Sequence, residues 1–259
     1  MDSGTGTVAG PVRVSVLRFV RGALFQSGWV VFTLVLGILG LPFLLLSREI
    51  TRKISWTWAR GTLCWLRLTT GIGYEIRGLE HLPASPSIVA LKHQAAFETF
   101  LLNQLLRDPA VVLKRELLKI PFFGWYLQAV GMIAIERSAG AGAMKSMIAQ
   151  ARAALAAGRP IAIFPEGTRG AVGAKTAYHP GVAALYSQLG VPLVPVALNS
   201  GLYWGKGLFA KRPGRVVVEI LPPIPSGLDR REAIRQLEIS IEATTAKLVA
   251  EARDKCTAR

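Results

Sequence analysis

The amino-acid sequence predicts an α/β fold: a mixed, mostly parallel sheet flanked by helices, with an N-terminal membrane-associated helical segment. After residue 71, short apolar runs alternate with helix-like stretches, a pattern typical of a sheet covered by helices. Before it, residues 22–47 carry no charge, and a helix needs about 20 apolar residues to cross a bilayer core. We therefore predict a membrane anchor with an interfacial helix over residues 1–70 and one α/β domain over residues 71–259.

The apolar run can either cross the bilayer or turn back within it. Gly40 and Pro42 are expected to kink or break a helix near the end of the run. Arg21 precedes the run and Arg48 follows it, and positive charge on both flanks gives no orientation. A spanning helix and a re-entrant hairpin with both ends in the cytosol therefore remain open.

Residues 48–70 are predicted to form a basic helix at the membrane interface. Three cations recur at every seventh position and so share one helical face, and three tryptophans are the aromatics expected at headgroup level. The cations are Lys53, Arg60 and Arg67, and the tryptophans are Trp56, Trp58 and Trp65. The alternative is an ordinary packed helix with a solvated basic face.

The elements of the α/β domain follow from its apolar patterning. Strands are predicted over residues 87–91, 110–113, 132–135, 160–164, 193–198 and 216–221. Helices are predicted over residues 96–106, 141–157, 181–189 and 229–253.

Charge and cysteine content narrow the function classes. The net charge of +15 fits nucleic acid, an anionic membrane surface or acidic substrates. Because the basic residues are dispersed and accompany an apolar segment, they favour a membrane over nucleic acid. The alternative is surface charge that serves solubility alone. Cys64 and Cys256 lie in no metal-ligand or disulfide pattern, which fits a reducing compartment and predicts no metal site.

The first candidate for chemistry is His93, which follows a predicted strand and precedes a predicted helix. An imidazole is a suitable general base near neutral pH, and a carboxylate on its other nitrogen improves it. Glu98 is five residues on, about 140° round a regular helix. The two side chains can meet only if His93 precedes the helix and Glu98 lies in its first turns. The alternative is an ordinary hydrogen-bonded histidine at a helix start.

The second candidate is the motif Phe-Pro-Glu-Gly-Thr-Arg at residues 164–169, directly after a predicted strand. A strand that ends in a glycine turn brings backbone N–H groups and an arginine to one spot. Such a spot can hold a phosphate, with charge-assisted hydrogen bonds from Arg169. The alternative is an ordinary turn whose arginine pairs with a nearby acid.

Two further cations, Lys114 and Arg137, stand at predicted strand ends, where ligands bind in α/β sheets. Each is also what a plain surface charge looks like. The apolar residues 120–125 between them are either a turn of the core or a wall of an acyl groove.

Taken in order, these motifs resemble the glycerolipid acyltransferase family. The order is His-x4-acid from His93, Lys-x-Glu-Leu from Lys114 with Pro-Phe-x-Gly, Ile-x-Arg ending at Arg137, Phe-Pro-Glu-Gly-Thr-Arg, and Val-Pro-x-Val-Pro-Val-Ala from Val191. The resemblance covers roughly residues 75–225, and the apolar N-terminal segment fits the family's membrane anchor.

The resemblance implies a role for each motif residue. His93 is expected to be the base and Glu98 its partner, although the family's usual acid is Asp and Glu is one methylene longer. Phosphate-binding candidates are Lys114, Arg137 and Arg169. Acceptor-site candidates are Glu166, Gly167 and Thr168.

The implied reaction is acyl transfer onto a lysolipid. Within the family the chain is most similar to bacterial members that move a fatty-acyl group from acyl-CoA or acyl carrier protein to the free sn-2 hydroxyl of 1-acylglycerol-3-phosphate (lysophosphatidic acid), giving phosphatidic acid. This implies a membrane lipid environment at the cytoplasmic face of a bacterial inner membrane, and neither a metal nor a cofactor is expected. The sequence has no Gly-x-Ser-x-Gly elbow, which favours direct transfer.

Two alternatives stay open. One is the same chemistry on another lysolipid, such as a lyso-ornithine lipid, whose lack of a phosphate would make the cations dispensable. The other is a non-enzymatic basic protein that binds membranes or nucleic acid through its charge.

Overall fold

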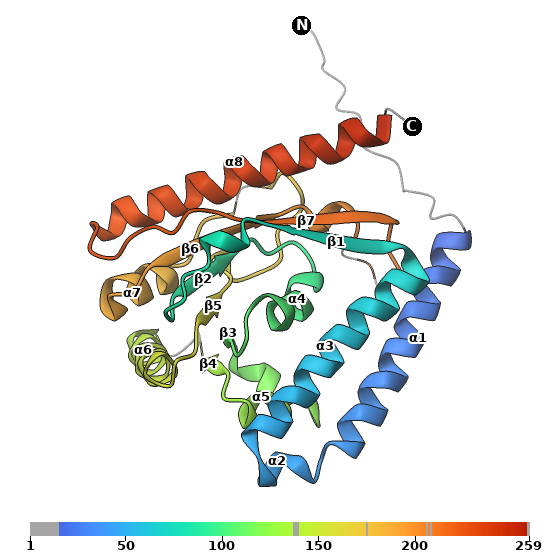
Figure 1. Cartoon of the computed structure of the whole chain (residues 1–259), viewed down its shortest axis with the longest axis horizontal. Helices are drawn as coiled ribbons and strands as arrows, with labels where there is room; N and C mark the ends of the chain where they lie inside the picture. The colour runs from blue at the N-terminus through green and yellow to red at the C-terminus, as the bar shows by residue number, and fades with distance from the viewer. Residues whose placement is uncertain (1–15, 137–139, 175, 206, 208, 258–259) are drawn as a thin grey trace, which may run out of the picture.

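The computed structural model describes residues 16–136, 140–174, 176–205, 207 and 209–257. Within these residues a seven-stranded sheet has the order β1-β7-β6-β2-β5-β3-β4 (Figure 1). The strands are β1 (Ile72–Arg77), β2 (Ile88–Leu91), β3 (Ala110–Lys114), β4 (Ile133–Ile135), β5 (Ile161–Ile163), β6 (Leu193–Leu198) and β7 (Gly214–Ile220). The pairs are parallel except β6 with β7, which run antiparallel. The predicted mixed, mostly parallel sheet is confirmed.

One strand was not predicted from the sequence. β1 lies at the edge of the sheet and pairs with β7 alone. Gly73, Glu75 and Arg77 interrupt its sequence, so it lacks the short apolar run by which the other strands are predicted. Because only one side of an edge strand pairs and its faces are half-exposed, weak β patterning suffices there.

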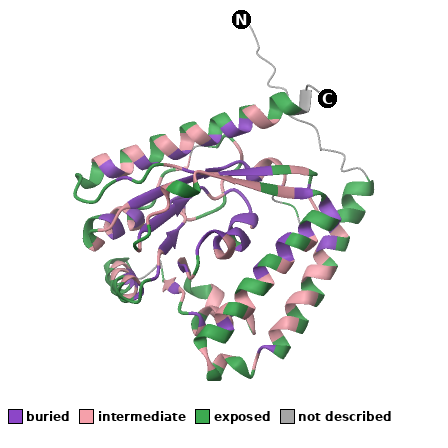
Figure 2. Ribbon diagram, viewed as in Figure 1, coloured by how far each residue is buried: buried purple, intermediate pink, exposed green. Residues whose placement is uncertain are grey.

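The two faces of the sheet are covered by different helices, as the alternation of side chains along a strand requires. Val89 and Leu91 of β2 belong to one apolar core with residues of α1 (Val16–Leu39), α3 (Arg48–Thr70) and α4 (Phe97–Leu105). Ile88 and Ala90 belong to a second core with residues of α6 (Gly140–Ala156), α7 (Pro180–Leu189) and α8 (Arg230–Thr257). Figure 2 shows the buried strands enclosed between these layers. The covering helices of the α/β domain are α4 (Phe97–Leu105), α6 (Gly140–Ala156), α7 (Pro180–Leu189) and α8 (Arg230–Thr257).

Short helical segments complete the fold. The 3-10 turns are η1 (Leu79–His81), η2 (Arg115–Lys119) and η4 (Ser200–Leu202), and α5 is Phe123–Ala129. The segment η2–α5 connects β3 to β4 beside the N-terminal helices, and the tyrosine hydroxyl of Tyr126 donates to the Gly37 carbonyl at 2.9 Å. The N-terminal helices and this segment are thereby tied together.

The N-terminal region is a helical hairpin. α1 (Val16–Leu39) ends just before Gly40, the chain turns through α2 (Phe43–Leu46), and α3 (Arg48–Thr70) returns along α1 (Figure 1). Pro42 explains the break, because proline lacks the N–H that a continued helix needs. The Ser47 hydroxyl accepts the N–H of Ile50 and caps α3.

Close packing inside the hairpin corrects one expectation. A Cβ on Gly28 would lie 2.4 Å from Trp65, so only glycine lets that indole pack against α1. Trp65 donates to the Phe25 carbonyl at 3.2 Å, and Trp58 donates to the Thr33 hydroxyl at 2.9 Å. The prediction of headgroup tryptophans is wrong for these two, which fill the hairpin interior. Trp56 is exposed.

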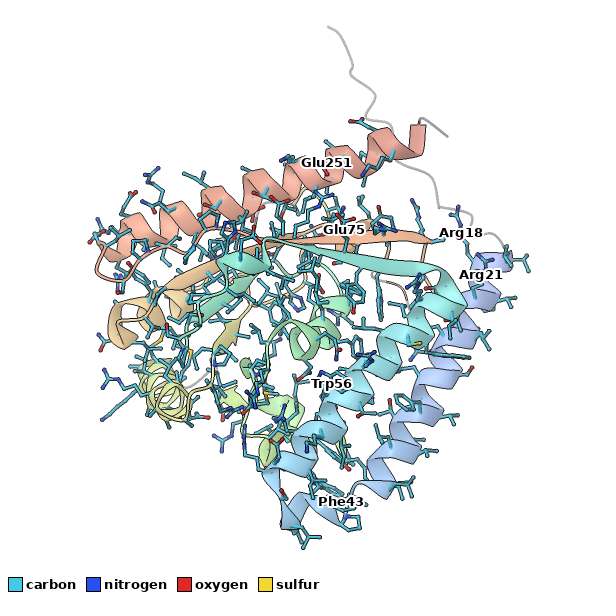
Figure 3. The ribbon with its side chains drawn as sticks, viewed as in Figure 1. Arg18, Arg21, Phe43, Trp56, Glu75 and Glu251 are labelled. Carbon is cyan, nitrogen blue, oxygen red and sulfur yellow. The ribbon has the colours of Figure 1, made fainter. Side chains whose placement is uncertain are left out.

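The outer surface of α1 is apolar. Among the described residues, α1 is the one helix that is long and apolar enough to cross a membrane. Only 11% of its most apolar stretch is buried inside the protein. Figure 3 places Arg18 and Arg21 at the N-terminal end of α1 and Phe43 near its opposite end. α3 shares one hydrophobic core with β1, β2, β6 and β7, and the division of the chain at residue 70 stays a prediction.

Candidate active site

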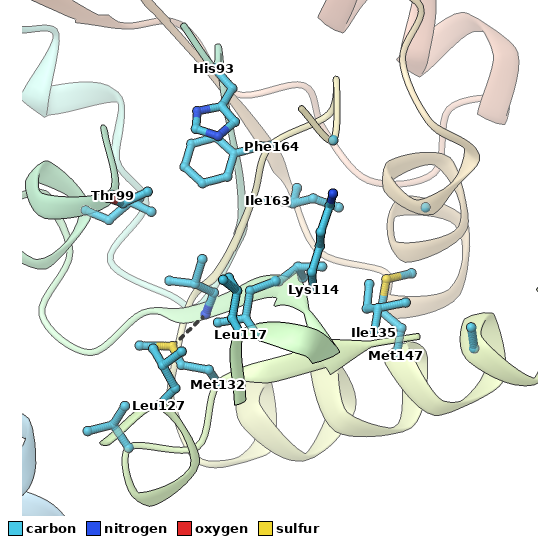
Figure 4. Close-up of a pocket in the computed structure, with 18 of the residues that line it drawn as sticks. His93, Thr99, Lys114, Leu117, Leu127, Met132, Ile135, Met147, Ile163 and Phe164 are labelled. Carbon is cyan, nitrogen blue, oxygen red and sulfur yellow. Dashed lines mark hydrogen bonds between the residues drawn. The ribbon is translucent and has the colours of Figure 1, made fainter. Parts of the chain in front are cut away.

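A cavity of about 1800 Å³ opens where the parallel strands end. His93 follows β2, Lys114 ends β3, Ile135 ends β4 and Phe164 follows β5, and all four line it (Figure 4). The cavity extends to Trp58 in the N-terminal hairpin. This is the edge at which ligands bind in α/β sheets, and most of the wall is apolar. A long-chain lipid substrate fits such a cavity.

His93 is held at this edge by its ring and its backbone. Its imidazole stacks on the Phe164 ring, with centroids 4.0 Å apart and planes at 21°. Its Nδ1 lies 3.7 Å from Oε2 of Glu98. That distance exceeds a hydrogen bond and fits a charge interaction once the ring is protonated. Nδ1 has no hydrogen-bond partner among the described residues.

Glu98 is fully buried behind His93. Its carboxylate accepts the backbone N–H of Gln94 at 3.0 Å and that of Ala95 at 3.0 and 3.1 Å, and it also accepts the Ser200 hydroxyl. Glu98 lies in the first turn of α4, where the helix dipole favours an anion. His93 precedes that helix, so the predicted local geometry is confirmed.

The Phe-Pro-Glu-Gly-Thr-Arg motif forms a tight turn beside His93. The N–H of Gly167 donates to the Phe164 carbonyl at 2.9 Å, and Gly167 has φ 63°, which glycine adopts without strain. Gly167, Thr168 and Arg169 line the cavity together with His93. The turn is anchored to the histidine because Gly170 donates its N–H to the His93 carbonyl at 2.8 Å.

Glu166 points away from the cavity into the protein. It is fully buried and does not belong to the cavity lining. Its Oε1 accepts the backbone N–H of His93 at 3.2 Å and lies 3.2 Å from Nζ of Lys92. Burial raises the pKa of this carboxyl, and the Lys92 ammonium opposes the rise. This geometry fits a structural role in which Glu166 holds the His93 backbone in place. Direct contact of Glu166 with the acceptor stays a prediction.

The two remaining cations are placed differently. Lys114 lines the cavity at the end of β3 (Figure 4), whereas Arg137 lies outside the described residues. Between them, Phe122 and Phe123 line the cavity, which favours the groove-wall interpretation of residues 120–125. Phe122 has φ 60°, which is costly for a bulky residue.

Comparisons with known proteins agree with this geometry. Residues 73–199 match the family described as Acyltransferase. A 1-acyl-sn-glycerol-3-phosphate acyltransferase from Pseudomonas aeruginosa is 37% identical over 244 residues, covering 92% of this chain and 93% of that protein. The chain belongs to the acyltransferase family.

More distant members of this acyltransferase family also align. A human 1-acyl-sn-glycerol-3-phosphate acyltransferase alpha is 29% identical over 205 residues, covering 78% of this chain and 71% of that protein. The crystal structure of a 1-acyl-sn-glycerophosphate acyltransferase from Thermotoga maritima superposes with a TM-score of 0.68 over 88% of this chain and 98% of that chain. At 23% identity the latter likeness establishes the shared fold.

Several residues of this acyltransferase site escaped the sequence interpretation. Ser200 donates to Glu98, and the half-buried Glu242 and Tyr178 join the buried Lys92 in a cluster. These residues are far from His93 in the chain, and no motif marks them. Lys92 was recognisable only as the neighbour of His93, since a lysine at the end of an apolar strand is usually solvated.

Proposed function

We propose that the chain is a 1-acylglycerol-3-phosphate O-acyltransferase that transfers a fatty-acyl group to the free sn-2 hydroxyl of lysophosphatidic acid, giving phosphatidic acid. One observation carries the proposal: the His93–Glu98 pair opens onto a large apolar cavity beside Lys114 and Arg169. The relative from Pseudomonas aeruginosa, which matches nearly the whole chain, supports the same reaction.

The proposed mechanism is direct transfer. His93 accepts the proton of the sn-2 hydroxyl as that oxygen attacks the thioester carbonyl carbon. The tetrahedral intermediate collapses, the C–S bond breaks, and the imidazolium returns its proton to the departing thiolate. Glu98 stabilises the transient imidazolium by charge, because its Oε2 lies 3.7 Å from Nδ1.

The proposed substrates follow from charge and shape. Arg169, Thr168 and the N–H groups of the Gly167 turn are proposed to bind the acceptor phosphate with Lys114, since guanidinium and ammonium groups form charge-assisted bonds to phosphate. The apolar wall receives acyl chains. Acyl-CoA and acyl carrier protein are both acidic, and the net charge of +15 attracts either donor.

The proposed setting is the cytoplasmic face of a bacterial inner membrane. The exposed apolar surface of α1 supports membrane association, and large exposed apolar patches mark such surfaces. The cavity reaches the hairpin at Thr33 and Trp58, so a lipid acceptor can enter from the bilayer side.

One assay tests the function. Purified full-length protein in phospholipid–detergent micelles is given lysophosphatidic acid with radiolabelled acyl-CoA or acyl carrier protein, and the lipid product is separated. We expect labelled phosphatidic acid. A lyso-ornithine lipid in place of lysophosphatidic acid is the matched acceptor without phosphate. Equal or greater transfer to it would overturn the assignment of the acceptor.

A further inference from the structure

An ionic cluster of buried and half-buried side chains adjoins the proposed active site. Neither the motif roles nor the mechanism uses Lys92, Glu242 or Tyr178, which join Glu166 in this cluster. The Lys92 ammonium is 2% exposed and lies 2.6 and 2.9 Å from the two carboxylate oxygens of Glu242 on α8. It also lies 3.2 Å from Oε1 of Glu166. The Tyr178 hydroxyl donates to Glu242 at 3.1 Å.

The cluster also contacts the backbone of His93, the proposed base. Oε1 of Glu166 contacts both the Lys92 ammonium and the backbone N–H of His93. On the other side of the same residue, the His93 carbonyl accepts the N–H of Gly170. The backbone N–H of Lys92 donates to the Val196 carbonyl at 2.9 Å, so the strand end is fixed as well. The His93 peptide is thus held on each side by the turn that is proposed to bind phosphate.

The charge of Lys92 is needed to keep Glu166 ionised, so that its carboxylate accepts the backbone N–H of His93. A buried carboxylate without a cation tends to take up a proton, and Oε2 of Glu166 has no hydrogen-bond partner among the described residues. Lys92 opposes that tendency, whereas Glu242, as a second carboxylate, favours it. Glu242 in turn fixes the ammonium, because two carboxylate oxygens lie within hydrogen-bond distance of Nζ.

We propose that Lys92, fixed by Glu242 of α8, is a positioning residue for acyl transfer: it holds the Glu166 carboxylate against the backbone N–H of His93 and so sets the distance between the base and the phosphate-binding turn. This proposal rests on the proposed function. It also gives α8, which lies across the sheet from α4 (Figure 1), a part in the geometry of the site.

The test compares kcat and KM of the full-length protein in the micelle assay. Lys92→Met keeps the length of the side chain and removes its charge. We expect kcat to fall about 10- to 100-fold, since displacement of a reacting group by about 1 Å can cost 100-fold, with the KM for lysophosphatidic acid unchanged. Glu242→Gln should lower kcat less. The matched control is Glu238→Gln, one turn earlier on the same helix, which should leave kcat unchanged.

A pH profile separates positioning from general destabilisation. Without the Lys92 charge, the buried Glu166 should ionise only at higher pH, so the acidic limb of kcat should move up by about one pH unit or more. The groups facing Glu166 are Lys92, the His93 peptide, Glu242 and the Tyr178 hydroxyl. In Lys92→Met combined with Glu166→Gln, no carboxyl remains to titrate there, and the limb should return to its wild-type position.

The outcomes are distinct. An inactive wild-type protein would refute the proposed function. Wild-type activity together with wild-type kcat in a folded Lys92→Met variant would refute only the positioning role. A reduced kcat whose acidic limb stays in place would also refute it, because the loss would then be structural. If Lys92→Met fails to fold, Glu242→Gln decides, and wild-type kcat in that variant overturns the proposal.

Discussion

The imidazole of His93 lies nearly flat on the phenyl ring of Phe164, with ring centroids 4.0 Å apart. This contact joins two motifs separated by about 70 residues in the chain. It fixes the plane of the imidazole without using either ring nitrogen, so both nitrogens stay available for proton transfer and for the carboxylate. Stacking of this kind contributes roughly 0.5–1.5 kcal/mol beyond the buried area.

The Phe164 ring is therefore expected to matter for turnover. Phe164→Leu keeps an apolar side chain but removes the flat surface, and we expect kcat to fall about tenfold because a stacking energy of that size corresponds to about one power of ten. The measurement is steady-state transfer to lysophosphatidic acid. Phe164→Tyr, which keeps a ring, is the control and should stay near wild type. Equal activity in the Leu variant would show that the ring does not orient the base.

Glu98 is expected to act through its charge. Glu98→Gln leaves one oxygen for three donors, the N–H groups of Gln94 and Ala95 and the Ser200 hydroxyl, and its amide would face one of them. We expect kcat to fall at least about 100-fold, the usual scale for disturbed acid–base catalysis. Kinetics of the purified variant check this.

Ser200→Ala serves as the companion to that variant, because it removes one donor and keeps the carboxylate. A modest loss is expected for it. If Glu98→Gln and Ser200→Ala were equally mild, the carboxylate charge would have no part in catalysis.

Arg169 is predicted to bind the acceptor and not to carry out the chemistry. Arg169→Ala should raise the KM for lysophosphatidic acid about tenfold or more, because a charge-assisted hydrogen bond contributes roughly 1.5–3 kcal/mol. The kcat should change little. Arg169→Lys keeps the charge and should lie between the two. An unchanged response to lysophosphatidic acid concentration in the Ala variant would remove Arg169 from the phosphate site.

Local patterning made most of the fold predictable. The sequence predicts Leu193–Leu198 with the bounds that the structure has, because a run buried on both faces is apolar throughout. The break at Pro42 was predicted, yet the choice between a spanning helix and a hairpin depended on α1 packing against α3, which glycines at positions 28 and 61 permit. These contacts join residues far apart in the chain, so a pattern within a short stretch of sequence cannot predict them.

The site was predictable where one segment contains both partners. His93 and Glu98 lie within one strand-to-helix junction, and the Gly167 turn lies within one hexapeptide. The direction of Glu166 was not predictable. Its side chain could face the cavity or the interior, and the choice depends on Lys92 and on Glu242, a residue more than 70 positions further along the chain.

Membrane association is expected to depend on the outer face of α1. The side chains of Val31 and Leu34 are 59% and 48% exposed, and little of the apolar stretch of α1 is buried. Replacing both with Lys should move protein from the membrane fraction to the soluble fraction, because a charge within the apolar region costs several kcal/mol. Thr57→Lys, at an exposed position on α3, is the control. Full retention of the double variant in carbonate-washed membranes would contradict this anchor surface.

Because of Lys211, we expect the free energy of unfolding to vary with pH in the alkaline range. It is 3% exposed, and burial lowers the pKa of its ammonium to about 8. Its Nζ lies 4.8 Å from the Phe25 ring centroid and 4.7 Å from that of Trp204, and these rings offset part of the cost of burying the charge. In the unfolded chain a lysine titrates near pH 10.4.

Between about pH 8 and 10.4 the unfolded chain binds a proton at Lys211 that the native state has released, so this residue makes the free energy of unfolding rise with pH. Below pH 8 both states are protonated, and the full burial cost remains. Thermal unfolding of wild type and Lys211→Met across pH 7–11 isolates this contribution, because other groups cancel in the difference. We expect the stability of wild type relative to Lys211→Met to increase through that window. Lys247→Met, at an exposed lysine on α8, should give a flat difference. A flat difference for Lys211→Met as well would mean that the two rings keep the ammonium as stable inside the protein as in water.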